Sequence, residues 1–103
     1  MEKKYKVIYL PSFYNDLDKI TDYIMYKLEN IIAANNLLDE IEKEIEKRSY
    51  NPDNYEKYVS TRRREDTYYR IYIKNYTIFY IVQDNSMELR RILYSKRNFK
   101  KLM

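Results

Sequence analysis

The stretch from Tyr68 to Phe99, YYRIYIKNYTIFYIVQDNSMELRRILYSKRNF, decides the fold of this chain. Apolar and polar residues alternate in it through three short runs, which is the period of half-buried β-strands. We expect strands at Tyr68–Ile73, Tyr76–Val82 and Met87–Tyr94. Lys74-Asn75 and Gln83–Ser86 are typical of tight turns, and we expect Asn75 to take a left-handed conformation because the chain has no glycine. The stretch therefore predicts an antiparallel meander.

The first half of the chain predicts one strand followed by two helices. Lys4 to Leu10 alternates like a strand, and Pro11 ends it, with Ser12 as the expected N-cap of the next helix. Apolar residues then recur at the helical gaps of three and four, first at Phe13, Leu17, Ile20, Ile24 and Leu28 and then at Ile31, Ala34, Leu38, Ile41 and Ile45. Asn30 is expected to break the chain and cap the second helix, which Lys47-Arg48 closes.

The order β-α-α-β-β-β is typical of an α+β domain in which a helical hairpin packs on a small, mainly antiparallel sheet. At 103 residues the chain is long enough for one modest core, and no linker or repeat divides it. We therefore expect a single domain over residues 1–103. Residues 51–67 are polar and too numerous for a hairpin loop, so we expect them to be mobile or to bind a partner.

Composition excludes several kinds of site. The chain has no cysteine and no histidine, which removes disulfides, thiolate metal sites, the commonest general base and the commonest metal ligand. We expect no metal and no cofactor. No window approaches the roughly 20 apolar residues of a membrane span, and the N-terminus lacks the pattern of a signal peptide. A soluble cytoplasmic protein without membrane contact is expected.

Charge is distributed unevenly between the two halves. Residues 1–54 carry 8 Lys/Arg against 11 Asp/Glu, a net charge of −3, and residues 55–103 carry 12 against 5, a net charge of +7. A basic face binds phosphates or an acidic protein segment with salt-sensitive affinity. The alternative is a solvated surface without a binding role. The basic residues that we consider as contacts for a nucleic acid or another target are Arg62, Arg63, Arg64, Arg90, Lys96, Lys100 and Lys101.

Four segments follow one another in a characteristic order. They are KVIYLPSF at residues 6–13, DLDKITDYI at 16–24, YYRIYIKNYTIFYIV at 68–82 and LRRILYSKRN at 89–98. The most specific parts are Tyr69-Arg70, the NYTIFY segment at Asn75–Tyr80 and the basic run Arg91–Arg97. In these segments and their spacing, the chain resembles the RelE/ParE superfamily of toxins from bacterial type II toxin–antitoxin modules.

This resemblance implies a toxin that inhibits growth, contributes to plasmid stabilization and forms an oligomer with its cognate antitoxin, encoded by the adjacent gene. RelE-like members are ribosome-dependent endoribonucleases that cut messenger RNA. ParE-like members poison DNA gyrase and cut no nucleic acid themselves. The resemblance therefore implies either gyrase or the translating ribosome with its messenger RNA as the target.

The resembling ribonucleases cluster basic residues on two adjacent strands and in the C-terminal segment. Arg70 and Arg97 match two such positions, and together with Tyr94 as acid or base they are the candidate catalytic residues of a ribonuclease. Tyr72 and Thr77 stand where that pattern has a lysine and an arginine. Loss of one donor that stabilises charge on phosphate typically costs about 10²–10³ in rate, so these departures favour the gyrase-poisoning activity.

Arg70 has a functional and a structural interpretation. It alternates with Tyr69 and Ile71, so we expect it on the face of the sheet opposite the core. In the functional interpretation it contacts a target or the antitoxin there. In the structural interpretation it is a solvated strand arginine that pairs with Glu88 or Asp66.

Arg90 and Arg91 are neighbours on one predicted strand, so their side chains point to opposite faces. One of them must approach the helix layer or an end of the sheet. We expect that arginine to be structural and to pair with Asp16 or Asp18. The triplet Arg62–Arg64 either clamps phosphates or forms a solvated loop.

Tyrosine is in excess, with 14 in the chain. Strand parity is compatible with core or sheet packing for Tyr5, Tyr9, Tyr69 and Tyr80. An exposed stacking surface, on which contact with a base contributes about 1–3 kcal/mol, is expected for Tyr72, Tyr76 and Tyr94. Tyr94 is also the candidate for acid–base chemistry because it lies beside Lys96 and Arg97.

Three functional hypotheses stay open. The favoured one is a ParE-like gyrase poison, and the first alternative is a RelE-like ribonuclease. The third is a degenerate toxin or a basic nucleic-acid-binding module. Whether the chain is an enzyme depends on the choice among them.

Overall fold

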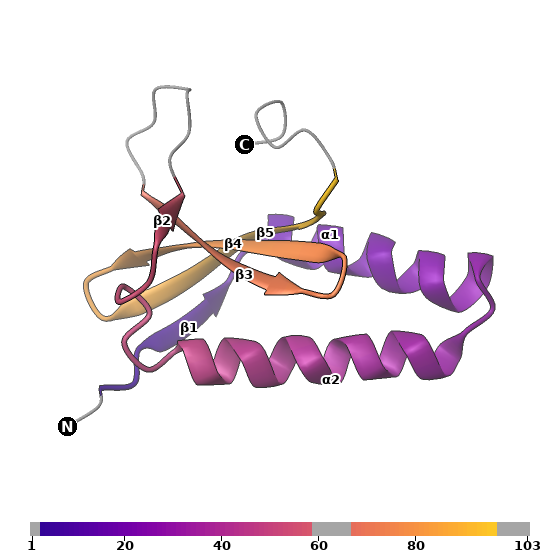
Figure 1. Ribbon diagram of the computed structural model, residues 1–103, viewed down its shortest axis with the longest axis horizontal. Helices are drawn as coiled ribbons and strands as arrows, with labels where there is room; N and C mark the ends of the chain where they lie inside the picture. The colour runs from indigo at the N-terminus through magenta and orange to yellow at the C-terminus, as the bar shows by residue number, and fades with distance from the viewer. Residues whose placement is uncertain (1–2, 59–66, 97–103) are drawn as a thin grey trace.

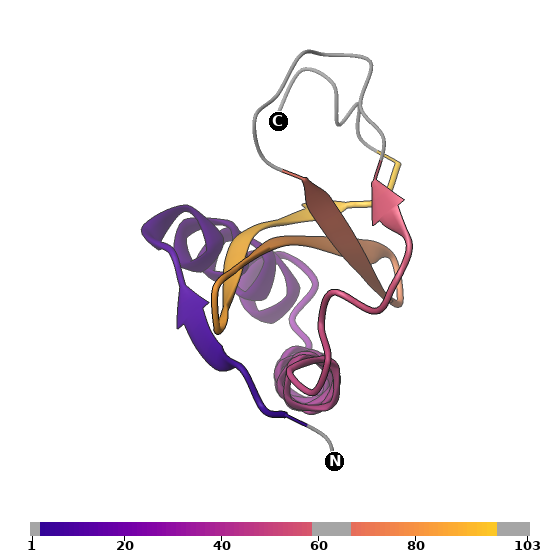
Figure 2. The same ribbon diagram turned by 90° about the vertical axis from the view of Figure 1, so that its left-hand side faces the viewer.

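The computed structural model describes residues 3–58 and 67–96. Two helical segments pack on a five-stranded, mainly antiparallel sheet of order β1-β5-β4-β3-β2, which confirms the predicted α+β class (Figure 1). The elements are β1 (Lys6–Tyr9), α1 (Pro11–Asp22), the π-helix η1 (Tyr23–Lys27), α2 (Ile31–Arg48), β2 (Lys57–Tyr58), β3 (Tyr68–Ile73), β4 (Tyr76–Gln83) and β5 (Ser86–Tyr94). Figure 2 looks along α2 and shows it beneath the sheet, with α1 beside β1 and β5.

The predicted meander forms the centre of the sheet. β3, β4 and β5 pair antiparallel, and β1 pairs with β5 in parallel. The bounds of β3 are as predicted, and β4 and β5 are each one residue longer. Strand β2 lies within residues 51–67, where a loop was predicted, because two residues are too few to show a strand period. Residues 59–66 of that segment lie outside the described residues.

The two turns of the meander place the left-handed residue one position earlier than predicted. The backbone angle φ is 52° at Lys74 and 53° at Asp84, and it is not positive at Asn75. The favoured two-residue hairpin turns require a positive φ at their first loop position. The geometry of the turn therefore overrides the preference of asparagine for this conformation.

The two helices begin in different ways. Ser12 does not cap α1 as predicted, and its hydroxyl instead donates a hydrogen bond to the backbone carbonyl of Arg90 (2.7 Å). Pro11 occupies the first turn, where its fixed φ suits the helix and its missing N–H needs no cap. Asn30 caps α2 as predicted, because its side-chain oxygen accepts a hydrogen bond from the N–H of Ala33 (2.9 Å).

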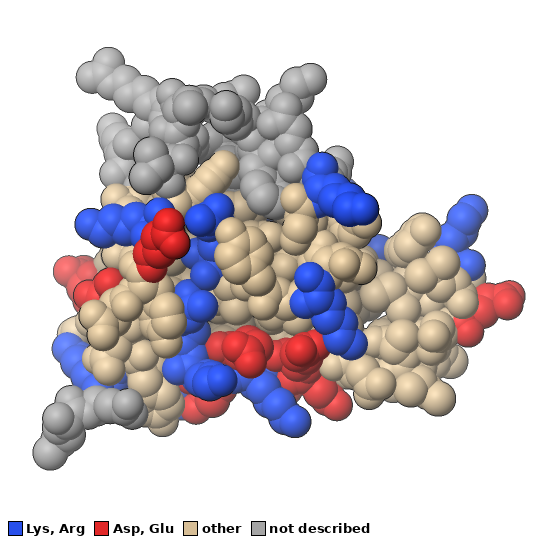
Figure 3. All heavy atoms as spheres, viewed as in Figure 1, with Lys and Arg blue, Asp and Glu red and all other residues tan. Residues whose placement is uncertain are grey.

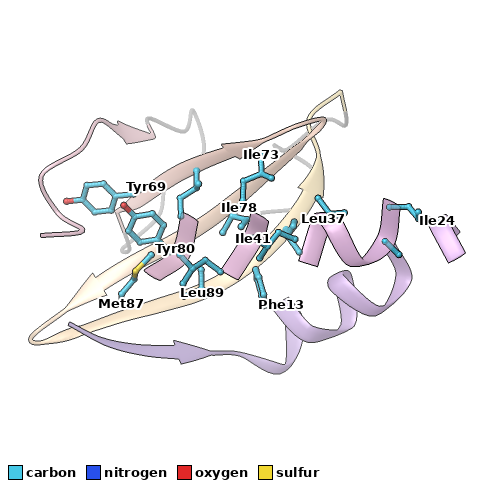
Figure 4. Close-up of a cluster of buried hydrophobic side chains, with 14 residues drawn as sticks. Phe13, Ile24, Leu37, Ile41, Tyr69, Ile73, Ile78, Tyr80, Met87 and Leu89 are labelled. Carbon is cyan, nitrogen blue, oxygen red and sulfur yellow. The ribbon is translucent and has the colours of Figure 1, made fainter. Parts of the chain in front are cut away.

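A helix-facing core fills the space between the helices and one face of the sheet (Figure 4). It contains Phe13 from α1, Ile41 from α2 and Ile78 from β4, all of them buried. Tyr69 and Tyr80 stack within it with ring centroids 5.4 Å apart, as their strand parity predicted. Partly buried side chains at its border include Tyr5 and Tyr9.

Parts of the predicted helical stripes lie outside this core. Leu37 is buried in place of Leu38, since gaps of three and four both fit a helix. Leu28 and Ile31 are 55% and 60% exposed. The π-helix η1 shifts the phase of the 3.6-residue spacing just before Leu28, and the end of the hairpin extends beyond the strands (Figure 1). Residues there have no sheet to cover them.

The side of the sheet away from the helices is here named the outer face. Its residues are Tyr58, Tyr68, Arg70, Tyr72, Thr77, Phe79, Ile81, Glu88 and Leu93. Tyr68, Phe79, Ile81 and Leu93 form a second buried cluster on it. A β-bulge opposite Phe79 and Tyr80 changes the parity of β5, so Leu89 faces the helices whereas Leu93 faces outward.

Candidate functional site

Arg70 lies on the outer face between two tyrosines. Its guanidinium carbon is 4.9 Å from the ring centroid of Tyr58 and 5.4 Å from that of Tyr72. Arg70 is half-buried, whereas Tyr72 is 62% exposed. A guanidinium against aromatic rings still presents planar N–H groups to phosphate or carboxylate. The structure thus brings together two residues expected from the sequence, Arg70 and Tyr72, and adds Tyr58.

Arg70 has no carboxylate within ion-pair distance among residues 3–58 and 67–96. Of the two partners predicted for it, Asp66 lies outside the described residues and Glu88 binds Arg90 instead. Nε and Nη2 of Arg90 donate to the same carboxylate oxygen of Glu88, at 3.1 and 3.0 Å. The side chains of Arg90 and Glu88 are 27% and 21% exposed, so this pair is largely shielded from water. Arg90 is therefore already bound to an acid.

Arg91 is the structural member of the arginine pair. Its Nε and Nη2 donate to the two carboxylate oxygens of Asp16, at 2.6 and 2.9 Å. The same carboxylate accepts a hydrogen bond from the backbone N–H of Ile92 (3.1 Å). This hydrogen bonding with Asp16 raises the pKa of Arg91. The predicted pairing of one arginine with a carboxylate of the first helix is confirmed, and it ties α1 to β5.

Arg48, at the end of α2, holds the backbone behind Arg70. Its Nη1 donates to the carbonyl of Arg70 (2.8 Å) and to the hydroxyl of Tyr80 (3.0 Å). The ring of Tyr55 lies 3.7 Å from its guanidinium carbon. The hydroxyl of Tyr80 donates to the carbonyl of Pro52 (2.7 Å), and burial raises the pKa of Tyr80 to about 12. These contacts fix β3 at the position of Arg70.

Thr77 occupies the position where the resembling ribonucleases carry an arginine. It lies opposite Tyr72 in the β3–β4 register and is fully buried. Its hydroxyl is hydrogen-bonded to the hydroxyl of Ser95 at 2.9 Å. This position therefore contributes neither positive charge nor accessible surface.

Tyr94 lies on the opposite side of the sheet from Arg70. It faces Tyr76 in the β4–β5 register, and the two rings pack edge to face with centroids 5.9 Å apart. Tyr76 is half-buried against the helix-facing core and is not part of an exposed stacking surface as predicted; burial, reinforced by Tyr94 and Tyr23, raises its pKa. The structure thus does not bring Tyr94 together with Arg70.

A family model described as the ParE toxin of the type II toxin–antitoxin system parDE matches residues 7–99. The chain belongs to the ParE toxin family. Membership of this ParE family makes it the toxin of a type II toxin–antitoxin pair and implies an antitoxin partner. A search of curated proteins gave no match. In the described part of this ParE toxin, no helix has the length and apolar character required to cross a bilayer.

Several candidate residues of this ParE toxin have no described structure: Arg62, Arg63, Arg64, Arg97, Lys100 and Lys101. Lys96 is described and exposed. Sequence reasoning missed Tyr58 as a neighbour of Arg70 because β2 is too short to show alternation. It treated Arg48 only as a closing charge of α2, and no local pattern signals its contacts with residues more than twenty positions away.

Proposed function

We propose that this chain inhibits bacterial growth by poisoning DNA gyrase, without cutting RNA itself, and that the antitoxin encoded by the adjacent gene neutralises it. The observation that carries this proposal is the pairing of the arginines. Arg90 is bound to Glu88 and Arg91 to Asp16, whereas Arg70 has no carboxylate partner among the described residues. A single available guanidinium suits recognition of a target better than phosphoryl chemistry.

The requirements of RNA cleavage support the same choice. Attack by the 2′-hydroxyl needs a base for its proton, cations for the charge on phosphate and an acid for the leaving 5′-oxygen. Thr77 is buried and Tyr72 is a phenol, so neither supplies a cation. Tyr94 lies across the sheet from Arg70 and packs on Tyr76. Loss of one charge-stabilising donor typically costs about 10²–10³ in rate.

In the proposed function, Arg70 and Tyr72 are the central contacts for the target. Basic residues of the second half of the chain, which carries a net charge of +7, add long-range attraction. The residues proposed for this role are Arg62, Arg63, Arg64, Arg90, Lys96, Lys100 and Lys101. Their contribution should weaken as salt is added.

A RelE-like ribonuclease is the second candidate, and the surroundings of Arg70 favour it. An exposed ring at Tyr72 beside a guanidinium can stack on a base while the cation binds the adjacent phosphate. Arg70 and Arg97 would then stabilise the phosphate, with Tyr94 as acid or base. The placement of Tyr94 on the helix side of the sheet weighs against this assignment.

Expression of the chain alone, from an inducible promoter in a bacterial host without the antitoxin, tests the proposal. Messenger RNA and plasmid DNA are sampled from the same culture. We expect intact messenger RNA, cleaved DNA and induction of the DNA-damage response. Messenger RNA cut within codons during translation, with undamaged DNA, would overturn the proposal in favour of the ribonuclease. Normal growth with neither lesion would indicate a degenerate toxin or a nucleic-acid-binding module.

A further inference from the structure

An apolar groove lies where the helical hairpin meets the turn between β3 and β4. Its volume is about 580 Å³. We name it the tip groove and define it by the side chains of Lys19, Ile20, Tyr23, Leu28, Tyr76 and Tyr94. The groove is on the helix side of the sheet, and neither Arg70 nor Tyr72 lines it. It is therefore separate from the outer face that we assign to the target.

The tip groove exposes an unusual amount of apolar surface for so small a protein. Tyr23 and Leu28 in its wall are 52% and 55% exposed. The apolar surface continues along the hairpin, where Tyr26 is 73% exposed and Ile32 is 74% exposed. In Figure 3 the end of the molecule that carries the hairpin is mostly tan, with few charged side chains. Single exposed apolar residues are ordinary, but a contiguous patch of them marks an interface.

The charge of the tip groove selects the kind of partner. Lys19 is the charged side chain in its lining, and none of the described residues places a carboxylate there. A nucleic acid needs several cations along its backbone, which this end of the molecule does not offer because Asp22 and Glu29 flank Lys27 in the sequence. A protein segment with apolar side chains and a nearby acidic residue meets both the apolar wall and the single ammonium group.

We propose that the tip groove is the docking site for an acidic, amphipathic segment of the cognate antitoxin. Apolar side chains of that segment cover Leu28 and the rings of Tyr23 and Tyr94, and an Asp or Glu of the segment pairs with Lys19. The inference rests on the proposed function only in taking the antitoxin as a partner. Docking here would leave the side chains of Arg70 and Tyr72 to a different contact.

The test measures the affinity of the purified toxin for the antitoxin encoded by the adjacent gene, by isothermal titration. Leu28→Asp places a carboxylate in the groove, and Tyr14→Asp makes the same change at another half-exposed position of the hairpin. Lys19→Glu reverses the charge in the groove, and Lys43→Glu does so on the exposed surface of α2. Circular dichroism establishes that each variant is folded.

We expect Leu28→Asp to weaken binding of the antitoxin by about tenfold or more, as for a residue at the centre of an interface. Lys19→Glu should weaken it by about threefold to tenfold, and this loss should shrink as salt is added. Both control variants should bind like the unmodified toxin. Because Lys19 is exposed, its variant remains informative if Leu28→Asp does not fold.

Other outcomes overturn the proposal. Unchanged affinity in both groove variants would exclude the antitoxin as the occupant. Unchanged affinity with loss of growth inhibition would assign the groove to the target, and a change in the toxin's own self-association would assign it to a second copy of the chain. A failure of the gyrase hypothesis is distinguishable, because it changes which nucleic acid is damaged and leaves these affinities as they are.

Discussion

The helix-facing side and the outer face of the sheet are made by alternate residues of the same strands, yet they differ in kind. Toward the helices, Ile71 and Ile78 lie among other apolar side chains and are almost fully excluded from water. On the outer face, Arg70 and Glu88 are half-buried and Tyr72 is exposed. One side therefore supplies stability, and the other carries the groups that can recognise a partner.

The outer face is nevertheless not a plain solvated surface. Phe79, Ile81 and Leu93 are buried on it, and Glu88 and Asp16 hold two of its neighbouring arginines. The comparison shows that charge on this face is positioned by specific pairs, with Arg70 set between tyrosines. The predictions below test this division, beginning with the largest expected effect.

Truncation in the helix-facing core should cost most. Ile78→Ala removes a fully buried side chain from the central strand β4, and we expect it to lower the free energy of unfolding by about 3 kcal/mol. Tyr72→Ala, on the outer face, is the control and should cost less than about 1 kcal/mol. Urea unfolding measures both. Equal losses would contradict the division between the two faces.

Breaking the pair that ties α1 to β5 should come next. Asp16→Ala removes the acceptor for Arg91 and for the N–H of Ile92, so we expect a loss of about 2 kcal/mol, in the range for hydrogen bonds to charged groups. Asp18→Ala, at an exposed position two residues away, should change stability by no more than about 0.5 kcal/mol. Similar unfolding midpoints for the two variants would show that the pair contributes little.

Alkaline pH should weaken the helix-facing side through Tyr80. Its folded-state pKa is about 12, whereas an unfolded tyrosine titrates near pH 10, so protons leave the unfolded chain first. Stability is retained below about pH 10 and falls as the pH rises toward 12, by up to about 2 kcal/mol from this group. Tyr80→Phe lacks that loss. The stability difference between the unmodified chain and Tyr80→Phe should therefore narrow with pH, and parallel curves would refute the assignment.

Removing the Arg70 side chain should have the smallest effect on stability. Arg48 binds the carbonyl of residue 70 and not its side chain, so that contact survives in Arg70→Ala. We expect the free energy of unfolding to change by no more than about 0.5 kcal/mol. Growth inhibition should nevertheless be lost. A large destabilisation would mean that Arg70 holds β2 in place through Tyr58, and would give the residue a structural role.

The periodic elements could be predicted from the sequence because one face of each is buried. The bounds of β3, β4 and β5 were predicted to within a residue, since burial against the helices imposes strict alternation. The same reasoning could not find β2, which has two residues, or the π-helix η1, which breaks the helical phase before Leu28. It also could not place the left-handed residue at Lys74, because the turn position decides that.

The candidate site was only partly predictable. Alternation along β5 led to the pairing of Arg91 with a helix carboxylate. The contacts of Arg70 with Tyr58 and of Arg90 with Glu88 depend on the pairing of β2 and on the bulge in β5, which no local pattern reveals. Tyr94 was considered for its neighbours in sequence, whereas the sheet separates it from Arg70.

The most direct test of the central claim uses purified toxin, purified DNA gyrase and plasmid DNA. Gyrase-linked cleavage of the plasmid is quantified against toxin concentration for the unmodified chain and for Arg70→Ala. We expect cleaved plasmid with the unmodified toxin, and a requirement for about tenfold more of the variant, as for a central contact residue. No cleaved plasmid at any concentration, with messenger RNA cut in a parallel translation reaction, would contradict the account.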